Sequence, residues 1–71
     1  MLNRDKLRGK MAEKRCTAEK LANFLGINPT TLHRKTVGDS EFTRSEIQQV
    51  SILLGLSMQE IKDIFFADEL A

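Results

Sequence analysis

Residues 17–35 read TAEKLANFLGINPTTLHRK, and this stretch decides the fold of the chain. An apolar stripe at helical spacing ends at Leu25, and Gly26 follows it directly. Asn28 and Pro29 then give a start signal, because an Asn side chain caps free backbone N–H groups and a proline ring fits the first helical position. The pattern predicts two short helices joined by a tight turn.

The second of these helices has one inward apolar anchor, Leu32, and an outward face that is polar and cationic. That face carries Thr30, Thr31, His33, Arg34 and Lys35. A cationic helix that follows a glycine turn is the arrangement that places a recognition helix in the major groove of DNA. The stretch therefore predicts a helix-turn-helix motif.

The motif resembles that of helix-turn-helix proteins of the phage-repressor and Cro type, the XRE-like group. Such proteins carry a small residue in the first helix, a glycine four positions later and an aliphatic residue six positions beyond the glycine. Ala22, Gly26 and Leu32 stand at these spacings. The resemblance implies a five-helix, lambda-repressor-like architecture that binds operator DNA.

Two positions depart from the family pattern. Ala18 stands where such proteins often place a phosphate-binding glutamine, which puts that phosphate contact in doubt. Lys35 stands where a second aliphatic anchor is usual. We expect Val37 to supply the missing packing.

The rest of the chain predicts three further helices, so the expected fold class is all-α, one compact five-helix domain over residues 1–71. The first helix is expected over residues 3–15. Residues 43–46 and 57–60 are Ser/Thr-x-x-Glu capping boxes that open the fourth and fifth helices. The fifth helix is expected over about 57–66.

The two halves of the chain carry opposite charge, although the whole chain has a net charge of only +1. Residues 1–38 hold nine Lys/Arg and three Asp/Glu, a net charge of +6, whereas residues 39–71 hold two and seven, a net charge of −5. The basic half coincides with the motif, so we interpret it as an electrostatic footprint for phosphate. The alternative is ordinary solvated surface charge.

The resemblance places base contacts at the end of the turn, at the start of the recognition helix and one turn further along. These positions hold Asn28, Pro29, Thr30 and Arg34. Arg34 is the main candidate because its guanidinium can pair with O6 and N7 of guanine, with a phosphate-only role as the alternative. Asn28 either caps the helix or reads a base. Phosphate contacts are expected from Thr17, Lys20, Thr31, His33 and Lys35, where His33 is alternatively a base-rim contact or simply exposed.

One recognition helix reads only a few base pairs, so we expect a homodimer, at least on DNA, bound to a palindromic operator. The last helix offers more apolar side chains than one inward face can hide. The expected dimer surface is Ile61, Phe65, Phe66 and Leu70. Adjacent Phe65 and Phe66 point about 100° apart on a helix, so one should be partly exposed unless Phe66 folds back on the core.

Several other classes have no support in the composition. The chain has one His and one Cys and shows no convergent carboxylate pair, Gly-rich phosphate loop or metal-ligand spacing, so no catalysis, metal, cofactor or small-molecule substrate is expected. No run approaches the roughly 18 apolar residues of a membrane span, and a single cysteine fits a reducing cytoplasm.

The sequence thus predicts a cytoplasmic, sequence-specific, double-stranded DNA-binding transcriptional regulator of phage or prophage type. The alternative is a protein-interaction module of the antitoxin, adaptor or antirepressor kind on the same helical fold.

Overall fold

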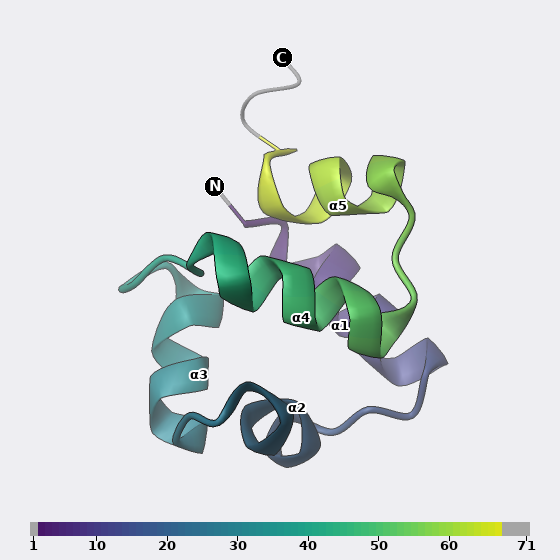
Figure 1. Ribbon diagram of the computed structural model, residues 1–71. Coiled ribbons are helices and arrows are strands. Elements are labelled where there is room, and N and C mark those ends of the chain that lie inside the picture. The colour runs from purple at the N-terminus through teal and green to yellow at the C-terminus, as the bar shows by residue number, and fades with distance from the viewer. Residues whose placement is uncertain (1, 68–71) are drawn as a thin grey trace.

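The computed structural model describes residues 2–67, within which the chain forms five α-helices and no strand (Figure 1). The helices are α1 (Arg4–Glu13), α2 (Ala18–Leu25), α3 (Pro29–Val37), α4 (Arg44–Leu54) and α5 (Met58–Phe65). The predicted all-α, five-helix fold is confirmed. Each described helix is too short or too polar to cross a membrane.

Polar caps fix where the helices begin. Asn3 caps α1, and the two predicted capping boxes open α4 and α5. In the first box the Glu46 carboxylate accepts the backbone N–H of Thr43 at 2.8 Å, and in the second the Glu60 carboxylate accepts that of Ser57 at 2.9 Å. These bonds, with the reciprocal bonds to the two hydroxyls, satisfy N–H groups that a helix start leaves unpaired.

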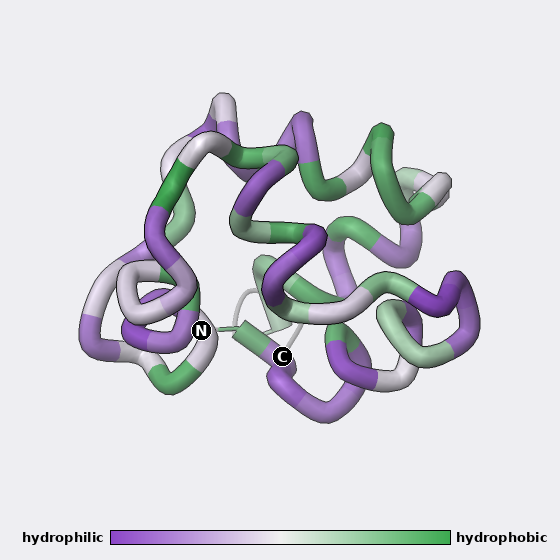
Figure 2. The backbone as a smooth tube through the Cα atoms, turned by 90° about the horizontal axis from the view of Figure 1, so that it is seen from below, coloured by the Kyte–Doolittle hydropathy of each residue, from purple (hydrophilic) through white to green (hydrophobic). Residues whose placement is uncertain are grey.

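A small apolar core joins the five helices. Every helix contributes to it, with Leu7, Leu21, Ala22, Leu32, Val50, Leu54, Ile64 and Phe65, together with Cys16 from the α1–α2 link. Figure 1 shows α4 crossing the middle of the molecule, and it packs against both α2 and α5. Apolar residues recur between hydrophilic ones along the helices (Figure 2), as expected for amphipathic helices around one core.

The predicted role of Val37 is wrong, because this side chain is 40% exposed. Lys35 itself fills the position of the missing aliphatic anchor. Its side chain is only 11% exposed, its ammonium lies 2.9 Å from Oε1 of Glu46, and it sits 5.9 Å from the ring centroid of Phe42. The apolar stem of Lys35 and its ion pair therefore do the packing that we had expected from Val37.

Candidate nucleic-acid interface

The predicted pair of helices joined by a glycine turn is present. Gly26 ends α2 with φ +72°, in the left-handed region that glycine adopts without strain. Asn28 Oδ1 accepts the backbone N–H of Thr30 at 2.7 Å, and Pro29 opens α3. Leu32, 2% exposed, anchors α3 in the core. The local signals in the sequence therefore fix both the turn and the direction in which α3 leaves it.

The outer face of α3 is open to solvent. Thr30 and Arg34 are both exposed and stand one helical turn apart, so they share a strip of this face. Within residues 2–67 no ion pair involves Arg34. Its guanidinium donors are thus unpaired with the carboxylates of this part of the chain.

Two of the predicted contact residues also act as helix caps. Because Asn28 Oδ1 is used by the cap of α3, only its side-chain NH₂ group is left to meet a base. Thr17 Oγ1 accepts the backbone N–H of Lys20 at 3.1 Å, which leaves its hydroxyl proton to donate to an anion. Lys20 and Thr31 are exposed, as a phosphate contact requires.

A phosphate contact by Lys35, as predicted, requires a free ammonium group, but this ammonium is already bonded within the chain. Its ammonium donates to Glu46 at 2.9 Å and to the carbonyl oxygen of Glu41 at 3.1 Å. Burial raises the pKa of Glu46, but the N–H of Thr43 and the ammonium of Lys35 outweigh burial and lower it overall. Lys35 therefore ties α3 to α4, and a sequence pattern did not reveal this because the partner is 11 residues away.

The predicted dimer surface is only partly available. Phe65 is 8% exposed, and its ring meets that of Phe42 edge-on with the centroids 5.5 Å apart. The prediction for Phe65 is corrected, because the ring packs inside its own chain. Ile61 and Phe66 are half-buried at the edge of the core, and Leu70 lies outside the described residues.

Two arginines that the sequence analysis did not single out line a groove between α1 and α3. Arg4 and Arg8 form one side of this groove, and Pro29 and His33 lie on the other, with Leu32 among the residues beneath them. The two arginines are four residues apart, so the sequence alone places them on the same side of a helix. Only the fold reveals that α3 is the neighbour of that flank.

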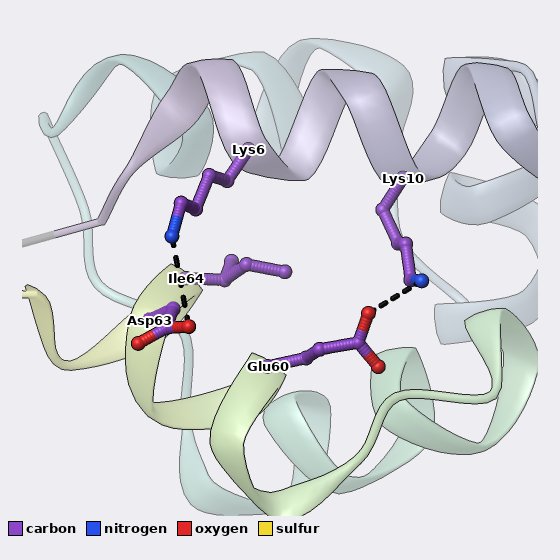
Figure 3. A pocket seen from close by; sticks show the side chains of 5 residues that line it. All are labelled: Lys6, Lys10, Glu60, Asp63 and Ile64. Carbon is purple, nitrogen blue, oxygen red and sulfur yellow. Dashed lines mark ion pairs between the residues drawn. The ribbon is translucent and has the colours of Figure 1, made fainter.

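The opposite flank of α1 faces α5 and is closed by ion pairs (Figure 3). Lys6 Nζ lies 3.6 Å from Oδ2 of Asp63, and Lys10 pairs with Glu60. The ammonium of Lys10, together with the backbone N–H of Ser57, lowers the pKa of Glu60 to about 2. The cationic charge of this flank is therefore compensated by the acidic α5.

Comparison with known proteins gives no relative. No protein-family model, curated protein or solved structure matches this chain. Across residues 2–67, no three His, Cys, Asp or Glu side chains gather where they could hold a metal ion.

Proposed function

We propose that the protein is a sequence-specific double-stranded DNA-binding transcriptional regulator of the phage-repressor or Cro type, in which α3 enters the major groove. The observation that carries this proposal is the exposed strip of α3 formed by Thr30 and Arg34, held outward by the buried Leu32. The major groove admits a helix of this size and presents a distinct donor and acceptor pattern for each base pair.

The residues of α3 have unequal roles in this proposal. Arg34 reads a guanine through two parallel bonds to O6 and N7, since its guanidinium is a rigid fork of donors. Thr30, one turn earlier, donates or accepts at a base edge or packs its methyl group on a thymine. Pro29 contributes shape or a contact with a thymine methyl group, and Asn28 contributes its amide NH₂ group.

Phosphate contacts hold the duplex in register. Thr17, Lys20, Thr31 and His33 are exposed around the motif and fit this role. The backbone N–H groups at the starts of α2 and α3 add to it, because the helix dipole favours an anion there. The long-range attraction comes from cations of residues 1–38 that take part in no ion pair within residues 2–67, among them Arg4, Arg8, Lys20 and Arg34.

The proposed assembly is a homodimer on DNA. Two copies related by a two-fold axis would place their α3 helices about 34 Å apart, one turn of the duplex, and select a palindromic operator. Ile61 and Phe66, which lie half-buried at the edge of the core, are the described candidates for the contact between copies. A dimer seated on an operator would block polymerase sterically, or recruit it.

An electrophoretic shift assay against a duplex library tests the proposal. Arg34→Ala should weaken specific binding by about 1–3 kcal/mol and relax the preference at one base pair, because a bidentate base contact is lost. Lys62→Ala is the matched control, since it removes one exposed positive charge from α5. If the two variants bind with the same affinity and base preference, Arg34 does not read a base.

A protein-interaction module is the second candidate. Within residues 2–67, the most exposed large apolar residues are Met58 (72%) and Ile52 (68%), which lie on α5 and α4 rather than on α3. Weak DNA binding without base preference, combined with tight capture of a protein through α4 and α5, would favour this candidate over the regulator.

A further inference from the structure

Helix α1 presents two cationic flanks on either side of one buried residue. Leu7 is fully buried and anchors the helix. Lys6 and Lys10 stand four residues apart on the flank toward α5, and Arg4 and Arg8 stand four residues apart on the flank toward α3. The same helix therefore carries two pairs of cations at the same spacing, which differ in residue type and in their surroundings.

The α3 flank borders a hollow that is lined mainly by apolar residues and has Arg4 and Arg8 on its α1 side. Arg4, Arg8 and His33 are all exposed at the rim of the groove between α1 and α3. Within residues 2–67 neither arginine takes part in an ion pair, whereas both lysines of the other flank do. Positive charge that is not paired with a carboxylate attracts an external anion.

The groove lies directly beside the strip of α3 proposed to read bases. Pro29 and His33, which line the groove, are one helical turn apart, and Thr30 and Arg34 follow each of them by one residue. Adjacent helical residues point about 100° apart, so the groove strip lies on the flank of α3, roughly a quarter-turn round the helix from the base-reading strip. A helix lying in the major groove has a phosphate backbone along each side, so the α1–α3 groove would face one of them.

We propose that the α1–α3 groove seats a phosphate of the DNA backbone through the guanidinium groups of Arg4 and Arg8. This inference rests on the proposed function, because the anion is supplied by a duplex in which α3 is docked. Arginine suits the task, since its planar fork binds a phosphate through two parallel bonds where a lysine offers a point charge. The contact positions the protein on the duplex and reads no base.

The salt dependence of duplex binding tests the groove. We expect Arg4→Ala and Arg8→Ala each to reduce the slope of log K against log salt, by about 0.9 for the two together, because the pair neutralises one phosphate. Affinity should fall by the same factor for the operator and for an unrelated duplex. Lys6→Ala is the matched control on the same helix, and its slope should equal that of the wild type because Asp63 already compensates this charge.

The variant Arg8→Lys separates the contribution of the positive charge of Arg8 from that of the planar shape of its guanidinium. This variant should restore the slope but not the full affinity, because it keeps the charge and loses the fork. Circular dichroism of every variant should match the wild type, since the substituted side chains are exposed. Replacing chloride by inorganic phosphate at equal ionic strength should weaken duplex binding by the wild type more than by Arg8→Ala, because free phosphate competes for the same guanidinium groups.

The outcomes separate the two proposals. If the wild type binds duplexes with a steep slope but the arginine variants behave like Lys6→Ala, the groove is not a phosphate seat and the regulator proposal stands. If the wild type shows no salt-dependent binding to any duplex, both proposals are overturned.

Discussion

On one flank of α1, Lys6 and Lys10 pair with carboxylates of α5, whereas on the other flank Arg4 and Arg8 line a groove beside α3. The sequence counts all four as equal contributions to a basic half with net charge +6. In space the two lysines contribute to the fold, because their charge is compensated by Asp63 and Glu60. The comparison teaches that the charge available to a partner is the part that the protein leaves uncompensated.

The same distinction applies to the lysine of α3. Lys35 pairs with Glu46 as Lys10 pairs with Glu60, and each glutamate is the third-position acid of a capping box. The side chains of the first pair are 11% and 14% exposed, and those of the second are 20% and 36% exposed. Each lysine ties its own helix to the start of another, and the more buried pair should contribute more to stability.

The largest effect is expected from substituting Leu7, the buried residue that lies between the two flanks of α1. Leu7→Ala should lower the free energy of unfolding by about 2–5 kcal/mol, because it leaves a cavity between α1 and the other helices. That is a large part of the roughly 5–15 kcal/mol that stabilises a small domain. Urea denaturation followed by circular dichroism measures the loss. A loss below that of an exposed control such as Ala12→Gly would contradict the packing of α1 described above.

The two lysine–glutamate pairs can be compared directly. Lys35→Met should lower the free energy of unfolding by about 1–2 kcal/mol, because it leaves the Glu46 carboxylate without its charged partner in a mostly covered position. Lys10→Met should lower it less, since water screens the pair with Glu60. Denaturant midpoints of the two variants provide the measurement. Equal losses would show that burial does not separate the two pairs.

The pH dependence of stability gives the smallest expected effect. The pKa of Glu60 is lowered to about 2 in the folded chain, below its ordinary value of 4.5, so its stabilising contribution is complete above about pH 4.5 and is lost as the pH falls toward 2. Thermal unfolding of the wild type and of Glu60→Gln between pH 2 and 6 would detect it. The advantage of the wild type should vanish at the acid end, and a constant difference would contradict the role assigned to Lys10.

Local signals in the sequence were sufficient for the helices and the turn. Gly26 ends α2, Asn28 caps α3, and the boxes that include Glu46 and Glu60 open α4 and α5, each through bonds that span only a few residues. Such signals depend on backbone chemistry close along the chain, and for that reason they can be read before the fold is known.

The contacts between helices could not be predicted in the same way. The sequence pattern predicts Lys35 as an exposed phosphate ligand, but its ammonium donates to Glu46, which is 11 residues away in the sequence. The sequence pattern predicts Phe65 as a dimer contact, but its ring packs against Phe42 of the same chain. Arg4 and Arg8 were indistinguishable from other surface charges, because the choice of α3 as their neighbour is made by the tertiary arrangement.

The most direct test of the central claim is selection of bound duplexes from a random pool by the wild type and by Arg34→Ala. The account predicts that the wild type enriches a two-fold symmetric sequence with half-sites about one duplex turn apart. It also predicts that Arg34→Ala loses the preference for guanine at one position of each half-site. A wild type that enriches no sequence, or an Arg34→Ala variant that enriches the same one, would contradict the claim that α3 reads DNA.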